Sequence, residues 1–500
     1  MSLLLIFILI FILFIRLKLL KNCSLQAVDQ FYWLNYRNSV NQQKMFPPKI
    51  PIYILDVKQW YPPLFGYFLS KLPDRIFKHS IILTQILSLI RLTIIIIFFF
   101  YIKKSFSFEI FLGIIIYLTS PILVYYDNQI NSRILGAIIL DILILLFYFY
   151  FQFLYISLLI PIIILTIFLI YTHKMCHQLY LFILIGLSIY YKTIIPIGIY
   201  SIAIIISFLF FNYKKYLLAH IDIVTFWHRN KYKLGAHQFY ESPIYGKKNF
   251  VYKNRIHGKN LKLWLKKIAL IIGMFPFMIF LIFNLKFNYF GLIIFFTLLF
   301  IFLTSFVPFL YCLGMGALYT YNLVSFSILY IVYTRIDYHT CENIFLLFLT
   351  FLLTSINILK FYNGLKQKSK QKDILLEQAI DFLKKYKDID RILVIPFQLP
   401  DEIAYKTAKK VFWGAHGLGF KWLEPYFPVF KVKVEDAIQD WNLGGVFLQK
   451  NYWPEFFEKV NQKLFDKIYE NDKYVILKVK NWKNEDKIPD WAKENYKCVE

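Results

Sequence analysis

The chain has 500 residues, of which 58% are hydrophobic and 20% are aromatic, and its formal net charge is +26. Soluble globular proteins are about 45–50% apolar, so this composition excludes an ordinary soluble domain. The Lys and Arg residues lie mostly between and after long apolar runs, which favours membrane topology and contact with anionic lipid over nucleic-acid binding.

The apolar runs predict membrane helices. Segments such as 134–170 and 290–313 are long enough for a hydrocarbon core that requires about 20 residues per helix. Their apolar character is nearly continuous rather than alternating, which favours helices over a β-barrel. We expect a polytopic α-helical domain with about 10 or 11 transmembrane helices in residues 1–362, beginning with a retained helix at 1–20.

A long polar segment, residues 21–79, separates the first two helices and is predicted to be an external loop. Asp29 follows the first helix closely, and an aromatic-Pro-Pro turn begins at Tyr61. A shorter polar connection after the third helix contains Asp127 and Arg133.

Segment 179–211 has two interpretations, because Lys192 and Pro196 interrupt it. It crosses the membrane once, giving about ten helices, or twice, giving about eleven. One crossing places the basic segment 213–266 and the C-terminal region on the cytosolic side, as the positive-inside rule favours. Two crossings place both on the outer side. A lysine at membrane depth usually faces a cavity or the bundle interior.

The basic segment 213–266 is predicted to lie along the membrane surface, with Trp227 and Trp264 as anchors in the headgroup layer. Beyond the last apolar segment the chain becomes charged and alternates helical with strand patterns. Residues 391–396 are typical of a buried strand. We therefore expect a separate, small α/β domain at 370–500.

The two acids Asp29 and Asp127 are predicted to lie on one side of the helical bundle. Two such carboxylates suit a reaction that needs a general base and a second anion, which orients a sugar or holds a metal. The simpler alternative is that Asp29 is a solvated acid that happens to follow a helix.

At these residues the chain resembles the GT-C superfamily of integral-membrane glycosyltransferases, which take a sugar from a polyprenyl-phosphate carrier. The family pattern is an acid soon after the first helix, a Tyr-Pro-Pro-Leu turn, and a second acid in the next external loop. The matching elements here are residues 29–33, residues 61–65 and Asp127. Trp33 stands where the family frequently has His, and the resemblance covers roughly residues 1–200.

The resemblance implies inverting transfer, in which Asp29 deprotonates the acceptor hydroxyl and the polyprenyl phosphate leaves. Asp127 would be the second catalytic acid. The leaving phosphate needs cations, and Arg suits it through bidentate geometry, although Arg133 and Lys174 could instead snorkel to the membrane interface. The candidate substrate-binding residues are Tyr61, Arg133, His173, Lys174 and Lys192.

The implied partners are membrane lipid, a lipid-linked sugar donor and a glycan, lipid or protein acceptor, with no nucleic acid. The resemblance leaves a divalent cation, Mg²⁺ or Mn²⁺, open as a cofactor. The nearby His173, Cys176 and His177 do not supply the four ligands of a structural zinc site. The expected location is the inner or plasma membrane of a bacterium or the endoplasmic reticulum of a eukaryote.

A second hypothesis is a transporter or flippase for a lipid-linked glycan. An O-antigen polymerase-like enzyme is intermediate between the glycosyltransferase and the transporter. Transporters typically contain internal repeats and helices that break near the middle of the membrane. Only segment 179–211 suggests such a break, and the chain has no evident repeat.

Overall fold

The computed structural model divides the chain into two compact units. Unit 1 comprises Met1–Leu25, Pro62–Tyr213 and Lys259–Lys370, and unit 2 comprises Gln26–Tyr61, Lys214–Gly258 and Gln371–Glu500. Apart from Phe14, the predicted first helix lies outside the described residues. The structure describes residues 14, 28–43, 50–55, 60–77, 80–104, 107–232, 260–334, 336–370, 373–414, 420–427, 430–453, 455–485 and 489–490.

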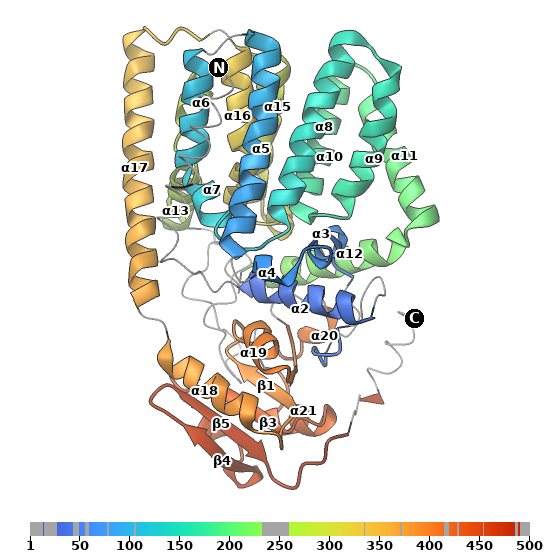
Figure 1. The fold of residues 1–500 in the computed structure, drawn as a ribbon, viewed down its shortest axis with the longest axis vertical. Coiled ribbons are helices and arrows are strands. Elements are labelled where there is room, and N and C mark those ends of the chain that lie inside the picture. The colour runs from blue at the N-terminus through green and yellow to red at the C-terminus, as the bar shows by residue number, and fades with distance from the viewer. Residues whose placement is uncertain are drawn as a thin grey trace. The chain divides into compact units, whose positions relative to one another are not determined.

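Unit 1 contains only helices among its described residues, and Figure 1 shows α5, α6, α8, α15 and α16 running alongside one another. Its helices are α3 (Leu64–Ser70), α4 (Asp74–Phe77), α5 (Ser80–Lys103), α6 (Phe108–Thr119), α7 (Pro121–Tyr126), α8 (Arg133–Phe153), η1 (Ile156–Leu158), α9 (Leu159–Ile170), α10 (Lys174–Tyr190), α11 (Ile195–Phe210), α13 (Leu261–Met274), α14 (Met278–Phe283), α15 (Tyr289–Phe306), η2 (Pro308–Leu313), η3 (Gly316–Tyr319), α16 (Thr320–Tyr333) and α17 (Cys341–Lys370).

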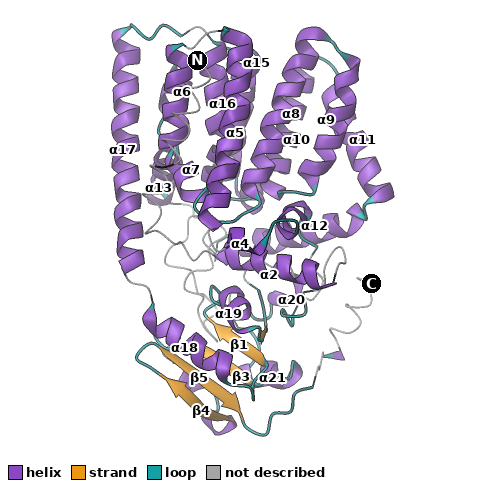
Figure 2. Ribbon diagram, in the orientation of Figure 1, coloured by secondary structure: helices purple, strands orange, loops and turns teal. Residues whose placement is uncertain are grey.

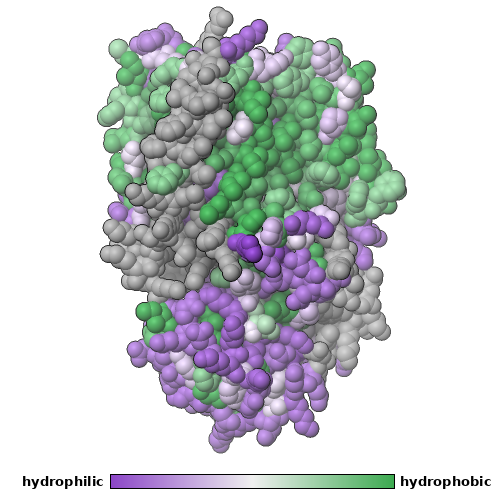
Figure 3. All heavy atoms as spheres, in the orientation of Figure 1, coloured by the Kyte–Doolittle hydropathy of each residue, from purple (hydrophilic) through white to green (hydrophobic). Residues whose placement is uncertain are grey.

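The helix α16 is the core of unit 1 and α17 lies at its margin. In the span Gly316–Tyr333, which includes α16, 94% of the residues are buried, whereas in the 18-residue apolar stretch of α17 only 11% are. The exposed side chains of α17 include Phe345 and Phe348. A helix that exposes such residues suits contact with lipid, and the space-filling view in Figure 3 shows hydrophobic side chains covering much of the visible surface of unit 1.

The protein is a multi-pass membrane protein, as predicted. Among the described residues, five helices are long and apolar enough to cross a membrane, or up to six if one bent helix pair counts as a single span. Shorter apolar helices of 10–17 residues are α6, Ile156–Ile170 and α10. This number does not include the predicted first helix, which lies outside the described residues apart from Phe14, and several other apolar segments are divided into shorter helices.

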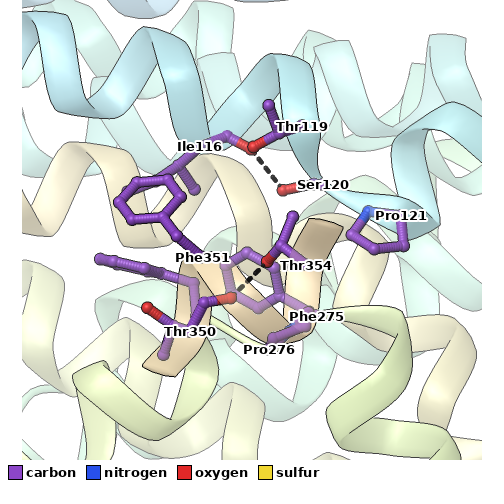
Figure 4. Close-up of a pocket in the computed structure, with 10 residues that line it drawn as sticks. Ile116, Thr119, Ser120, Pro121, Phe275, Pro276, Thr350, Phe351 and Thr354 are labelled. Atoms are coloured by element: carbon purple, nitrogen blue, oxygen red, sulfur yellow. Dashed lines mark hydrogen bonds between the residues drawn. The ribbon is translucent and has the colours of Figure 1, made fainter. Parts of the chain in front are cut away.

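Two of these divided segments break at proline, which has no backbone N–H to continue a helix. The first break, between α6 and α7, is at Pro121, and the second, between α13 and α14, is at Pro276. The two breaks border a gap of about 10 Å³, which Thr350 and Thr354 of α17 also line (Figure 4). The gap has room for about one water molecule, so it is too small for an organic ligand.

Segment 179–211 crosses unit 1 twice. The helix α10 ends at Tyr190, Lys192 lies in a turn with a φ of 49°, and α11 returns along α10. The Tyr171 hydroxyl donates to the Phe211 carbonyl at 3.2 Å, so the start of α10 and the end of α11 lie at one end of unit 1. This arrangement differs from the single crossing that charge favoured, and long loops are known to obey the positive-inside rule poorly.

That same end of unit 1 carries the polar connection after α7. The Leu64 N–H donates to the Tyr171 carbonyl at 2.8 Å, and the Tyr125 ring lies 5.4 Å from the ring of Phe361 near the end of α17. The chain therefore leaves unit 1 on the side of Asp127 after both α11 and α17.

Unit 2 contains the predicted α/β domain, with a five-stranded mixed sheet in the order β2-β1-β3-β5-β4 (Figure 2). The strand β1 pairs in parallel with β2 and β3, and β5 pairs antiparallel with β3 and β4. Every residue of β1 is buried, which confirms the strand predicted at 391–396. The strands are β1 (Arg391–Ile395), β2 (Lys410–Val411), β3 (Gly445–Gln449), β4 (Phe465–Glu470) and β5 (Tyr474–Val479).

Helices connect the parallel strands of unit 2, because parallel pairs need crossover connections. The helix α19 links β1 to β2, and α20 and α21 lie between β2 and β3. The helices of unit 2 are α2 (Val28–Gln43), α12 (Tyr213–Asn230), α18 (Ile374–Lys385), α19 (Pro400–Thr407), α20 (Phe420–Leu423), α21 (Val434–Asp440), α22 (Phe456–Lys459) and η4 (Gln462–Leu464).

Part of the predicted external loop packs on the C-terminal domain. Tyr53 forms a parallel bridge with Val411, and its hydroxyl donates to Asp401 Oδ1 at 2.5 Å. The side-chain amide of Asn35 on α2 donates to the Tyr53 hydroxyl at 3.1 Å and to the Asp401 carbonyl at 3.0 Å. The segment is thus partly helical and divided between the units, which differs from the predicted loop 21–79 and from domain boundaries at 362 and 370.

The start of the basic segment also differs from the prediction. It forms the helix α12, whose Phe226 stacks on Phe427 at 6.2 Å and whose Arg229 pairs with Glu424 at 2.6 Å. Trp227 is only 5% exposed, which does not fit the predicted role of headgroup anchor. Trp264, in α13, is exposed, as an anchor requires. Residues 233–259 of the predicted interfacial segment lie outside the described residues.

We expect Tyr53→Phe to loosen the packing of α2 on the sheet. Burial and the Asp401 carboxylate raise the pKa of Tyr53, so its phenol is neutral and donates to the carboxylate. Removing a hydrogen bond to a charged group costs about 1.5–3 kcal/mol. Hydrogen exchange of residues 28–43 should become faster, whereas Tyr405→Phe, at an exposed ring of the same unit, should leave it unchanged. Unchanged exchange in Tyr53→Phe would show that this bond does not hold α2.

Candidate functional site

The connection between α7 and α8 forms a buried polar loop in unit 1. Asp127 caps the end of α7, and Arg133 is the first residue of α8. Asn131 holds the loop, because its amide donates to the Tyr126 carbonyl at 2.9 Å and its Oδ1 accepts the Arg133 N–H at 3.0 Å. Asp127 and Asn131 are at most 5% exposed, so the loop lies within the helix bundle.

Two neighbouring helices hold Asp127. Ser88 of α5 donates to Asp127 Oδ2 at 2.6 Å, and Tyr321 of α16 donates to Oδ1 at 2.6 Å. The Asp127 carbonyl accepts from Thr84 at 2.6 Å and from Gln85 at 2.7 Å. Because each carboxylate oxygen already accepts a hydroxyl, this acid is well placed to fix the loop between α5 and α16.

Arg133 is a buried cation, with an exposed fraction of 9%. Its guanidinium carbon lies 4.0 Å from the centroid of the Tyr126 ring and 5.9 Å from that of Tyr321. Its Nη2 is 3.8 Å from the sulfur of Met175, whereas its Nη1 is buried without a hydrogen-bond partner among the described residues. Within that part of the chain no carboxylate pairs with Arg133, whereas Arg91, the other buried arginine described in unit 1, pairs with Asp141.

Asn128 lies in the same loop and is fully buried. Neither its side-chain oxygen nor its side-chain nitrogen has a hydrogen-bond partner within the described part of the chain. Buried polar groups are nearly always satisfied by protein, water or a ligand. Asn128 and the Arg133 Nη1 therefore mark a place where a polar ligand or water completes the site.

A fully buried ion pair lies deeper in unit 1. Arg91 Nε of α5 is 2.6 Å from Asp141 Oδ2 of α8, and both side chains are 0% exposed. Arg91 Nη2 donates to Ser325 Oγ at 2.7 Å, and that hydroxyl donates to Asp141 Oδ1 at 2.7 Å. The guanidinium also lies 4.9 Å from the ring centroid of Tyr321, so one tyrosine links this pair to Asp127.

The start of α10 lies beside the start of α8. A Cβ atom on Gly136 would come within 2.8 Å of His173 Cβ and 3.2 Å of Cys176 Sγ, so this close approach requires glycine. His173 caps α10 by accepting the Cys176 N–H on its Nδ1 at 3.4 Å. Lys174 is the next residue and is half-buried. The structure thus brings Asp127, Arg133, His173 and Lys174 to one end of unit 1.

Lys192 is not part of this cluster. It is exposed and follows the far end of α10, whereas His173 precedes the first residue of that helix. A helix of 17 residues is about 25 Å long at 1.5 Å per residue. The structure therefore separates Lys192 from the other candidate cations of unit 1. The prediction that it faces a cavity at membrane depth does not fit its exposed position in a turn.

The remaining two candidates belong to unit 2. Asp29 is half-exposed in the first turn of α2. Tyr61 is 3% exposed and packs edge-on against the rings of Tyr32 at 6.2 Å and Trp33 at 5.6 Å. This burial gives the Tyr61 ring a packing role. If both acids act on one sugar held at near-attack spacing, the Asp29 and Asp127 carboxylates should lie within about 15 Å of each other. This distance stays a prediction.

The described residues contain no group of three or more His, Cys, Asp or Glu side chains that could hold a metal ion. His173 caps α10, and His177 Nε2 lies 2.6 Å from the Tyr200 hydroxyl. The two histidines therefore make hydrogen bonds within the protein, and among the described residues they do not form a metal site with Cys176.

The sequence interpretation missed the residues that hold Asp127 and link it to the buried pair. Arg91 and Asp141 interrupt apolar helices, and a charge at such a position is itself a signal of function or pairing. Ser88 and Tyr321 carry no comparable signal, because hydroxyl residues are common in these helices. Their role depends on helices that meet only in the folded chain.

The sequence matches no protein-family model, and no curated protein matches it either.

Proposed function

We propose that the protein is a membrane glycosyltransferase that takes a sugar from a polyprenyl-phosphate donor at the Asp127–Arg133 end of unit 1. The observation that carries this proposal is the state of Arg133. It is a buried guanidinium with one nitrogen free of hydrogen bonds and with no carboxylate partner among the described residues. Such a group is suited to a phosphate, which it binds through two parallel hydrogen bonds.

The neighbours of Arg133 support a donor site. Tyr126 lies against the guanidinium and limits its orientation, and the unpartnered amide of Asn128 offers both a donor and an acceptor. His173 and Lys174 lie at the same end of unit 1 and add polar or cationic groups. A donor embedded in lipid presents its phosphate at the end of the membrane helices, where these groups gather.

In this proposal Asp127 is a positioning residue rather than the second catalytic acid. Its carboxylate accepts hydroxyls from Ser88 and Tyr321, and Tyr321 also lies against Arg133. The acid therefore sets the loop that carries the guanidinium. A divalent cation is not required by this arrangement, because Arg133 itself supplies the charge that stabilises the leaving phosphate.

The catalytic base in this proposal is Asp29, which accepts the proton of the acceptor hydroxyl. Its half-exposed position in the first turn of α2 is compatible with access to an acceptor. A general base must come within about 2.6–3.2 Å of the proton-bearing atom in the productive complex. The resemblance at residues 29–33 and 61–65 assigns the role to this acid.

Substitution of Arg133 tests the donor site. We expect Arg133→Gln to lower kcat/KM for a polyprenyl-phosphate sugar by about 10- to 100-fold, because hydrogen bonds to charged groups contribute about 1.5–3 kcal/mol. Arg133→Lys should recover part of the lost kcat/KM, because lysine keeps the positive charge but cannot form the bidentate contact with phosphate. The activity is measured with purified protein in lipid vesicles and labelled donor.

The matched control is Arg75→Gln, because Arg75 is an exposed arginine in α4 of the same unit. It should retain the activity of the unaltered protein. Equal activity of Arg133→Gln and Arg75→Gln would contradict the proposed donor site.

A further inference from the structure

Unit 2 contains a polar groove that the proposed transfer reaction does not use. Its volume is about 400 Å³, within the range of about 300–1,000 Å³ that is typical of ligand pockets. The helices α2, α18 and α19 contribute its walls. Its polar lining is formed by Asn38, Glu377, Asp381, Lys384, Tyr405 and Lys406.

One wall of the groove is held by ion pairs. Lys406 Nζ lies 2.7 Å from Glu377 Oε1 and 2.5 Å from Glu402 Oε1. Burial disfavours the charge on Lys406, but the carboxylates of Glu402 and Glu377 raise its pKa above the usual value. The lysine is therefore charged at neutral pH, and its contacts keep this wall in one geometry before any ligand arrives.

The other polar groups of the groove are free to bind. The side chains of Asn38, Asp381 and Lys384 make no hydrogen bond or ion pair with the described residues. Together they offer an amide, a carboxylate and an ammonium group, which is a full set of donors and acceptors. Asp381 and Lys384 are exposed, and Asn38 is half-buried.

Tyr405 supplies a flat apolar surface beside these groups. Its ring centroid lies 5.7 Å from that of Phe31, at an interplanar angle of 43°, and Phe31 is buried on α2. The tyrosine is nevertheless 38% exposed. The contact with Phe31 supports the ring from one side, and the exposed part is available to a ligand.

We propose that this groove binds an uncharged saccharide of the acceptor. A sugar ring has an apolar C–H face that packs on an aromatic ring and a rim of hydroxyls that both donate and accept hydrogen bonds. The groove has the matching parts, and the charges of Glu377, Asp381, Lys384 and Lys406 sum to zero, which favours a neutral ligand. The role of the bound sugar as acceptor rests on the proposed function, whereas binding itself does not.

Saturation-transfer NMR on the full-length protein in detergent tests the proposal, with methyl glucoside, methyl mannoside and N-acetylglucosamine as probes. We expect at least one sugar to bind. Tyr405→Ala removes the stacking surface and Asp381→Asn removes a hydrogen bond to a charged group, so each should weaken that binding about tenfold. Tyr405→Phe should retain it, because the ring remains. Asp388→Asn, an exposed acid that pairs with Lys478 in the same unit, is the matched control and should also retain it.

Two outcomes would overturn the proposal: no sugar binding, or binding that Tyr405→Ala and Asp381→Asn leave unchanged. Asp29→Asn separates the two proposals, since it should abolish transfer while sugar binding in the groove persists. Binding without any transfer by the unaltered protein would refute the proposed function and leave the groove assignment intact.

Discussion

Asp29→Asn is expected to abolish detectable sugar transfer while expression and membrane insertion persist. The amide keeps the shape of the carboxylate but cannot accept the acceptor proton. Loss of a general base typically lowers the rate by about 10²–10⁴. The measurement is the transfer of labelled sugar by protein reconstituted in vesicles, with the amount of folded protein determined in parallel.

The matched control for this substitution is Asp472→Asn, which removes an exposed acid elsewhere in unit 2. It should leave transfer unchanged. Full activity of Asp29→Asn would show that Asp29 is a solvated acid with no catalytic role, which is the simpler interpretation of its position after the first helix.

Arg91→Met is expected to destabilise unit 1 more than any other single substitution that we consider. Arg91 and Asp141 are both fully buried, and Arg91 also bonds to Ser325. Removing the cation leaves the Asp141 carboxylate buried without its counter-charge, and breaking such a pair costs about 3–5 kcal/mol. The measurement is denaturant unfolding of the purified protein in detergent.

The double substitution Arg91→Met/Asp141→Leu distinguishes the loss of one buried charge from the loss of the whole ion pair. It removes both charges, and replacing a buried pair by apolar residues of similar volume is often close to neutral. We therefore expect the double variant to be more stable than Arg91→Met alone. Arg75→Met, at an exposed arginine, is the control and should have little effect. A double variant less stable than either single one would contradict a structural role for the pair.

The helical membrane unit could be predicted because hydropathy is a local property of the sequence. Arg391–Ile395 was likewise predictable as a buried strand, since a run of apolar residues between polar segments is typical of one. The polar connection with Asp127 and Arg133 was also identified, because its residues interrupt the apolar pattern.

Long-range contacts could not be predicted in this way. Tyr53 bonds to Asp401 across 348 residues, and Tyr321 bonds to Asp127 across 194. No periodicity in either segment specifies its partner. These contacts explain why part of the predicted external loop belongs to unit 2 and why Asp127 is held by hydroxyls.

The prediction of the membrane side on which the basic segment lies also depended on one turn. Charge favoured a single crossing for 179–211, whereas the structure has two helices separated by a turn that contains Lys192. A difference of one crossing reverses the side of every later segment. Local geometry at a few residues therefore outweighed the charge distribution of a long loop.

The most direct test of the central claim is to follow a labelled polyprenyl-phosphate sugar in vesicles that contain the purified protein, across a panel of donor sugars and acceptors. The proposed function predicts that label leaves the lipid and appears on the acceptor, with one polyprenyl phosphate released for each sugar transferred. If the labelled lipid instead moves between leaflets with its sugar still attached, the protein is a transporter and the glycosyltransferase assignment is contradicted.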